Sequence, residues 1–183
     1  MRITAGRFKN KQVKTLDSEL IRPTLSKIRE SLFNVLQNDI ENASFLDLFA
    51  GSGIVGIEAA SRGAKEVIFI EKNPKHYKLL KENLKTLDFN NKAFLSDSTL
   101  MIEKFEENRF DIIFSDPPYK TDLNNKILEI IWRKKLLRKN GILILESSKE
   151  EDFSKQISDC GYEMIKEKTY GDTKVIYLTN SNL

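Results

Sequence analysis

The sequence predicts an α/β fold, a doubly wound and mostly parallel seven-stranded sheet preceded by an N-terminal β-hairpin arm. Short apolar segments alternate with helical ones from about residue 45 to 160, which is typical of a parallel sheet with right-handed crossovers. A glycine-rich loop follows the first apolar segment. Near the end of the chain, two strand-like segments flank Gly171-Asp172. They predict a closing hairpin whose last strand is antiparallel to its neighbour.

The arm is expected to span residues 1–24, and residues 25–183 form the main domain. Within the arm, residues 1–5 and 12–16 have the character of strands, and residues 6–10 contain the Gly and Asn of a turn. This pattern predicts a hairpin.

A helix is expected to begin at the Arg22-Pro23-Thr24 segment, with Thr24 as its N-cap. Its apolar stripe consists of Leu25, Ile28, Leu32, Val35 and Leu36. The expected strands of the main domain are 45–49, 67–70, 93–95, 110–114, 142–146, 164–170 and 174–178. The expected helices lie near 54–62, 74–87, 99–106, 124–137 and 152–160.

Composition favours a cytoplasmic protein without metal. The chain has 183 residues, of which 40% are hydrophobic and 31% charged. No run approaches the roughly 18 apolar residues of a membrane span, and the N-terminus has no apolar signal region, so we expect no membrane partner. A single cysteine, Cys160, and a single histidine, His76, exclude an intramolecular disulfide framework and a Cys/His metal cluster.

Positive charge is concentrated at the start of the chain. Residues 1–29 hold eight basic and two acidic side chains, a net charge of +6, whereas the remainder carries −3. A basic arm on a slightly acidic body is typical of proteins that bind phosphate backbones. Arg7, Lys9 and Lys11 are therefore expected to contact the substrate, although a merely solubilising extension would have the same composition.

The most informative motif is Asp116-Pro117-Pro118-Tyr119, which follows the apolar run 110–115. Two prolines continue neither a strand ladder nor a helix, so the chain leaves the sheet in a rigid turn. Ligand crevices of open α/β sheets lie at this carboxyl edge. The Asp116 carboxylate and the Pro117 carbonyl beside the Tyr119 ring suit a planar group that bears an NH2. A plain strand-ending turn with a capping Asp116 and a packed Tyr119 is the alternative.

A glycine-rich loop marks the cofactor site. Gly51, Gly53 and Gly56 fit the G-x-G-x-x-G pattern, in which the backbone turns tightly, approaches a ligand and packs helix on strand. Glu71 ends the next strand about 20 residues later, the spacing at which a carboxylate binds ribose hydroxyls. The first βαβ unit is therefore expected to bind an adenosine-like cofactor.

Asp47 distinguishes between two candidate cofactors, NAD and S-adenosylmethionine. It stands four residues before the first glycine, where an acid repels the pyrophosphate of NAD but pairs with the ammonium of S-adenosylmethionine (SAM). The alternative for Asp47 is a carboxylate that is hydrogen-bonded to loop amides. We expect SAM.

The acid, the glycine loop, Glu71 and the Asp-Pro-Pro-Tyr turn together resemble SAM-dependent methyltransferases that act on exocyclic amino groups. Three N-terminal segments narrow this resemblance to the bacterial 16S ribosomal RNA guanine-N2 methyltransferase family. They are Arg2-Ile3-x-Ala5-Gly6, Arg22-Pro23-Thr24 and Arg29-Glu30-Ser31-Leu32-Phe33-Asn34. The resemblance implies a sheet of the SAM-dependent methyltransferase type and an arm that contacts RNA. It also implies a guanine in 16S ribosomal RNA, or in the assembling small subunit, as target of a monomeric enzyme.

The expected site has three groups of residues. The catalytic residues are Asp116, Pro117 and Tyr119. The cofactor-binding residues are Asp47, Phe49, Gly51, Gly53, Glu71 and Asp97. The substrate-binding residues are Arg7, Lys9, Lys11, Arg22, Thr24 and Pro118. Asp97 stands where this fold class places an acid for the adenine amino group, but it is an equally good N-cap for the next helix.

Two other functions remain open. An amino-methyltransferase of this kind can act on adenine in DNA or RNA, or on a protein glutamine. Glutamine enzymes usually have Asn in place of Asp116, and DNA enzymes usually carry a separate recognition region, for which 183 residues leave little room. A non-catalytic RNA-binding module with the same fold is disfavoured, because the loop, the acids and the aromatic residue are all present.

Overall fold

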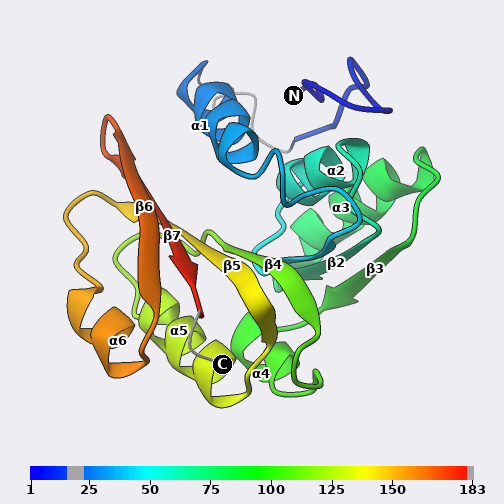
Figure 1. Cartoon of the computed structure of the whole chain (residues 1–183). Coiled ribbons are helices and arrows are strands. Elements are labelled where there is room, and N and C mark those ends of the chain that lie inside the picture. The colour runs from blue at the N-terminus through cyan, green and yellow to red at the C-terminus, as the bar shows by residue number, and fades with distance from the viewer. Residues whose placement is uncertain (16–22, 181–183) are drawn as a thin grey trace. The chain divides into compact units, whose positions relative to one another are not determined.

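The structure is a computed structural model that describes residues 1–15 and 23–180, apart from the side chains of residues 23–25. In chain order its elements are α1 (Pro23–Val35), β1 (Ser44–Asp47), α2 (Ile54–Ser61), β2 (Glu66–Glu71), α3 (Pro74–Lys85), β3 (Asn91–Leu95), α4 (Ser98–Ile102), β4 (Phe110–Ser115), α5 (Leu123–Arg133), β5 (Leu137–Ser148), α6 (Ser154–Asp159), β6 (Glu163–Tyr170) and β7 (Thr173–Thr179) (Figure 1).

The strands follow the order β3-β2-β1-β4-β5-β7-β6 in a seven-stranded sheet. Strand β7 is antiparallel to both β5 and β6, whereas β1 and β2, β2 and β3, and β4 and β5 pair in parallel. The predicted fold class, with its antiparallel last strand, is confirmed. The chain forms two compact units, Met1–Ser96 and Asp97–Leu183, which are described separately below.

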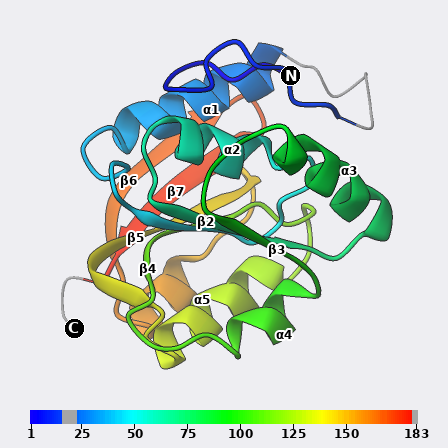
Figure 2. The ribbon, with the colours of Figure 1, turned by 90° about the vertical axis from the view of Figure 1, so that its right-hand side faces the viewer.

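In the first unit, helix α2 packs on β1 and β2, and α3 packs on β2 and β3 (Figure 2). Strands β1 and β2 are almost fully buried, as expected for apolar strands covered by helices. Gly56 allows the close approach of α2, because a Cβ atom there would lie 2.3 Å from the Phe69 ring of β2. This is the helix-packing role that the third glycine of the motif is expected to have.

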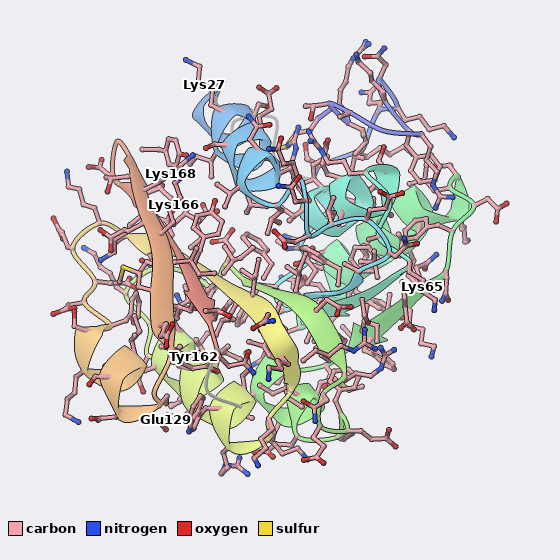
Figure 3. The ribbon with its side chains drawn as sticks, viewed as in Figure 1. Lys27, Lys65, Glu129, Tyr162, Lys166 and Lys168 are labelled. Atoms are coloured by element: carbon pink, nitrogen blue, oxygen red, sulfur yellow. The ribbon has the colours of Figure 1, made fainter. Side chains whose placement is uncertain are left out.

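In the second unit, α5 packs on β5, and α6 packs on α5 and β6. Tyr162, labelled in Figure 3, makes an edge-to-face contact with Trp132 of α5 at a centroid distance of 5.2 Å. Strand β6 lies at the end of the strand order and is mostly exposed, and Figure 3 shows Lys166 and Lys168 along it. Charged side chains of this kind protect an edge strand from pairing with other chains.

The arm reverses direction as predicted, but it does not form two regular strands. A single antiparallel bridge joins Arg2 and Gln12, and Ile3 accepts a hydrogen bond from Asn10 N at 2.9 Å. The amides of Thr4, Ala5 and Phe8 donate to side chains of α2 instead of to the opposite side of the hairpin, which interrupts the ladder. The last residue of the expected second strand, Leu16, lies outside the described residues.

Several helix boundaries differ from the sequence prediction. The helix expected over 99–106, for example, ends at Ile102. The expectation that Thr24 caps α1 is wrong, because the helix already begins at Pro23; proline suits the first helical position, where no amide donor is needed. The helix expected over 124–137 ends at Arg133. Lys135 has a left-handed φ of 49°, and the apolar Leu137 that follows begins β5.

No helix in the described ranges is both long and apolar enough to cross a membrane.

Candidate active site

The glycine loop after β1 has the backbone conformation that its sequence requires. Gly51 and Gly53 have φ angles of 53° and 84°, in the left-handed region that favours glycine. Space beside Gly51 is open, since a Cβ atom there would meet no described heavy atom within 4 Å. At Gly53 a Cβ atom would lie 2.5 Å from Leu80 of α3. The loop therefore presents bare backbone at Gly51 and is tightly packed at Gly53.

Glu71, at the end of β2, holds the glycine loop through its carboxylate. One oxygen accepts from Gly51 N at 2.7 Å and the other from Asn73 N at 2.6 Å. The side chain is buried. Because each carboxylate oxygen has two lone pairs, these bonds leave Glu71 able to accept further donors such as ribose hydroxyls.

Asp47, the last residue of β1, is also buried. Its Oδ2 accepts from Gly56 N of α2 at 3.1 Å. This bond supports the structural role that the sequence left open for Asp47, and ammonium binding remains a prediction. Phe49, two residues later, is partly exposed beside the same loop.

The chemistry of these residues fits SAM. Two buried carboxylates stand at the loop, beside the open backbone of Gly51. Asp47 and Glu71 suit the ammonium and the ribose hydroxyls of SAM, whereas two negative groups at a pyrophosphate would be repulsive.

Asn83 of α3 is a loop-holding residue that the sequence did not indicate. Its buried Nδ2 donates to the Ser52 carbonyl at 2.8 Å and to the Lys14 carbonyl at 3.0 Å. Lys14 N donates in return to Oδ1 at 3.1 Å. Its partners lie 31 and 69 residues away, so no local pattern could have marked it.

In the second unit, the Asp-Pro-Pro-Tyr segment leaves β4 as predicted. Asp116 directly follows the strand and is partly exposed, Pro117 is buried and Pro118 is exposed. The turn is fixed by two hydrogen bonds, from Thr121 Oγ1 to the Pro118 carbonyl and from Lys120 N to Glu151, both at 2.8 Å.

Tyr119 is not a core residue. Its side chain is 43% exposed, and its hydroxyl lies 2.9 Å from Thr173 Oγ1 at the start of β7. This position excludes the alternative of core packing for Tyr119. The hydroxyl is held in place while part of the ring remains accessible to a stacking partner.

Glu146 of β5 is a second acid at this strand edge that the sequence interpretation missed. Ser115 and Leu145 are register partners on the parallel strands β4 and β5, and Asp116 and Glu146 are the next residues along the chain from each. Burial raises the pKa of Asp116, and burial together with the Asp116 charge raises the pKa of Glu146. The expected strand 142–146 ends in this residue, as β2 ends in Glu71, and that similarity is the signal that could have identified it.

Asp97 is the N-cap of α4. Its Oδ1 accepts from Thr99 N at 3.0 Å and from Thr99 Oγ1 at 2.7 Å. The capping role that the sequence allowed is therefore observed, and contact with the adenine amino group remains a prediction.

The arm is anchored to α2 by Glu58, whose side chain is fully buried. Thr4 N donates to its carboxylate at 2.9 Å, Thr4 Oγ1 at 2.7 Å and Ala5 N at 3.1 Å. Arg62 Nε lies 2.9 Å and Arg29 Nε 3.4 Å from the same carboxylate. Five groups thus converge on one buried charge and fix the first residues of the arm.

Beyond this anchor, the arm presents the expected cations to solvent. Arg7, Lys9 and Lys11 are exposed, and none of them pairs with a carboxylate of the described residues. The Arg7 guanidinium lies 4.6 Å from the ring centroid of Phe8, and Lys11 Nζ lies 5.2 Å from it. Thr24 lies in α1 without a described side chain, and Arg22 lies outside the described residues.

Comparisons with known proteins show the family to which the chain is similar. The family described as Conserved hypothetical protein 95 matches residues 1–179. Ribosomal RNA small subunit methyltransferase D of Haemophilus influenzae is 34% identical over 93% of the chain and 89% of that protein. The protein of the same name from Buchnera aphidicola subsp. Acyrthosiphon pisum is 37% identical over 81% of the chain and 78% of that protein.

A solved structure, that of yhhF from Escherichia coli, covers 100% of this chain and 99% of its own with a TM-score of 0.86 at 27% identity. The family match over residues 1–179 and the identity to two named relatives together establish the family of the chain. The chain belongs to the Conserved hypothetical protein 95 family of SAM-dependent ribosomal RNA methyltransferases.

Proposed function

We propose that the protein transfers a methyl group from SAM to the exocyclic N2 amine of a guanine in 16S ribosomal RNA. The observation that carries the proposal is the turn after β4, where the partly exposed Asp116 and a 43% exposed Tyr119 flank two prolines. The relatives named as small subunit methyltransferases support 16S ribosomal RNA as the substrate class.

The turn supplies what an exocyclic amine needs. The lone pair of such an amine is delocalised into the purine ring, so the nitrogen is a poor nucleophile until its two N–H groups are held by acceptors. Asp116 and the Pro117 carbonyl are the acceptors, and Pro117 fixes the backbone between them. Stacking of the base on Tyr119 contributes about 1–3 kcal/mol and aligns the amine.

Bound SAM supplies a methyl group on a positively charged sulfur. Alignment of the amine with that group accounts for most of the catalysis. When the nitrogen gains the methyl group it must release one N–H proton, and Asp116 accepts it. Burial raises the pKa of Asp116 above its ordinary value of 3.8, which makes the carboxylate a better base near neutral pH.

The arm, residues 1–24, is proposed to supply RNA affinity without taking part in the chemistry. Arg7, Lys9 and Lys11 are exposed and lack acidic partners among the described residues, so they are free to pair with phosphates. Arg22, Thr24 and Pro118 are assigned to the same substrate. We place the enzyme in the cytoplasm as a monomer that acts on 16S ribosomal RNA or on the assembling small subunit.

Mass mapping of methylated nucleotides in small-subunit RNA, from cells with and without this gene, tests the proposal. We expect one N2-methylguanine to disappear on deletion and to return with the intact gene, but not with an Asp116→Ala variant. Loss of a methyladenine or of a methylated protein glutamine would instead identify one of the competing acceptors, and unchanged methylation would contradict the enzyme assignment.

A further inference from the structure

A second carboxyl group lies beside Asp116, in a position that the mechanism above does not use. Parallel pairing runs from Ile112 with Ile142 to Ser115 with Leu145. The next residues along the two strands are Asp116 and Glu146. Neighbouring strands lie about 4.8 Å apart, and residues at the same level point to the same face. Asp116 lies directly beyond the last register pair, so the two residues are neighbours across the strand ends, and the charge of Asp116 acts on Glu146.

A buried amide fixes this geometry. Ser115 Oγ donates to Asn124 Oδ1 at 2.8 Å, and Asn124 Nδ2 donates to the Glu146 carbonyl at 3.1 Å. Ser115 and Asn124 are both almost completely buried. Asn124 thus ties the end of β4 to β5 at the level where the two acids stand, and the acids cannot relax by separating the strands.

The surroundings offer no positive charge to compensate two negative ones. Glu146 is only 7% exposed. The titratable groups that influence this site are Asp116, Tyr119 and Glu151 near the turn and Tyr177 and Tyr170 on the closing hairpin. Tyr177 is buried, and its hydroxyl has no hydrogen-bond partner in the described part of the chain. No described Lys or Arg favours ionisation of either acid.

We propose that Glu146 is a positioning residue that holds a proton at neutral pH, so that the carboxyl pair carries one negative charge located on the more exposed Asp116. This inference rests on the proposed function of Asp116. Two like charges so close in a buried site do not both ionise readily, and the more buried acid retains its proton. Burial raises the pKa of both groups, and the Asp116 charge raises the pKa of Glu146 further, which agrees with this order.

The arrangement serves proton transfer from the amine. A proton released by the nitrogen passes to Asp116, and the pair then holds two protons and no charge. Because Glu146 is neutral beforehand, it places no second negative charge near the amine. The proton then leaves from Asp116, the partly exposed member of the pair, to water.

Carboxyl ¹³C NMR during a pH titration of the free protein tests this without any methyl transfer. We expect the Glu146 carbon, assigned by its loss in Glu146→Gln, to remain in the protonated form at neutral pH. In Asp116→Asn the same carbon should titrate at lower pH, because the neighbouring charge is gone. Titration of Glu146 at its ordinary value of 4.5, or a titration that Asp116→Asn leaves unchanged, would overturn the proposal.

Activity gives an independent readout. Glu146→Gln has a side chain that cannot ionise, so the pH dependence of kcat distinguishes this variant from the parent. At alkaline pH the parent should lose kcat as Glu146 ionises, and Glu146→Gln should lose less; the RNA is identical in both assays. The inference would be refuted if Glu146→Gln were folded and bound SAM normally but were inactive. That result would show that activity requires the ionised carboxylate of Glu146. If the parent itself methylates no RNA, the proposed function fails, and the NMR titration still decides the state of the pair.

Discussion

The side chain of Asn83 and the backbone of Lys14 hold each other by two reciprocal hydrogen bonds, from Lys14 N to Oδ1 at 3.1 Å and from Nδ2 to the Lys14 carbonyl at 3.0 Å. The same Nδ2 donates to Ser52 in the glycine loop. One buried amide therefore connects the arm at Lys14 to the loop that we assign to the cofactor.

Replacement of Asn83 by Ala should weaken both SAM binding and stability. It leaves backbone groups of Lys14 and Ser52 without their partner, at a cost of about 1–3 kcal/mol in unfolding free energy. Urea unfolding and titration calorimetry with SAM measure the two effects. Lys85→Ala, an exposed change on the same helix, is the control. A variant that binds SAM as tightly as the parent would show that the loop does not depend on Asn83.

The cofactor assignment predicts that SAM and its demethylated product bind in calorimetry, whereas NAD does not. Glu71→Ala should weaken SAM binding by about 1.5–3 kcal/mol, the value of charge-assisted hydrogen bonds. Glu66→Ala, on the same strand, should have little effect. Comparable affinity for NAD would contradict the assignment.

Asp116→Ala should abolish methyl transfer to RNA and leave SAM affinity nearly unchanged, because the hydrogen bonds of Asp116 go to the acceptor amine. Asp111, on the same strand, pairs with Arg138 at 2.7 Å, and Asp111→Ala should retain activity. Single-turnover kinetics with labelled SAM measure the difference. Substantial methyl transfer by Asp116→Ala would remove this carboxylate from the mechanism.

Replacement of Arg7, Lys9 and Lys11 by Ala should weaken RNA binding and leave SAM binding unchanged. The slope of log affinity against log salt should flatten by up to about 0.7–0.9 per lost phosphate contact. KM for RNA should rise much more than kcat falls, the signature of lost uniform binding. Both quantities follow from filter binding and kinetics at several salt concentrations.

A variant with Lys75, Lys78 and Lys81 of α3 changed to Ala removes the same number of charges and is the control. We expect it to affect RNA binding less. An arm variant with the affinity and salt slope of the parent would support a merely solubilising arm.

Stability should fall as pH rises. The folded-state pKa values of Asp116 and Glu146 are raised, so their contribution is fully present below their unfolded values of 3.8 and 4.5. It is lost as pH rises through the folded values. Urea unfolding from mild acid to mild alkali should show this decline, and Glu146→Gln should show a shallower one. Equal slopes would contradict the raised pKa of Glu146.

Local pattern was sufficient to predict the strands and the motifs at their ends. The apolar run before Asp116 predicted β4, and the glycine spacing predicted the turn into α2, because these features depend on neighbouring residues. The regular hairpin predicted for the arm is not observed, because the amides of Thr4 and Ala5 donate to Glu58, more than 50 residues away.

Residues that act through distant partners were missed. Asn83 and Asn124 are asparagines in helices, where nothing in the surrounding sequence distinguishes a buried amide from a surface one. The position of Glu146 at the end of an expected strand marked it as a candidate acid, but its relation to Asp116 depends on the pairing of β4 with β5. The sequence contains each acid but not the alignment of the two strands.

The Glu58 anchor limits how the arm can be exchanged or removed. Deletion of residues 1–5 would remove three hydrogen-bond donors from the Glu58 carboxylate, which has no exposed surface. The buried charge would then be inadequately paired, which is strongly destabilising. A truncated protein would thus lose activity through misfolding, whether or not the arm touches RNA. For the same reason, a chimera that joins the arm of one family member to the body of another should fold only if Thr4, Glu58 and Arg62 are transferred together. The start of the arm and α2 therefore form one structural unit, although more than 50 residues separate Thr4 from Glu58 in the chain.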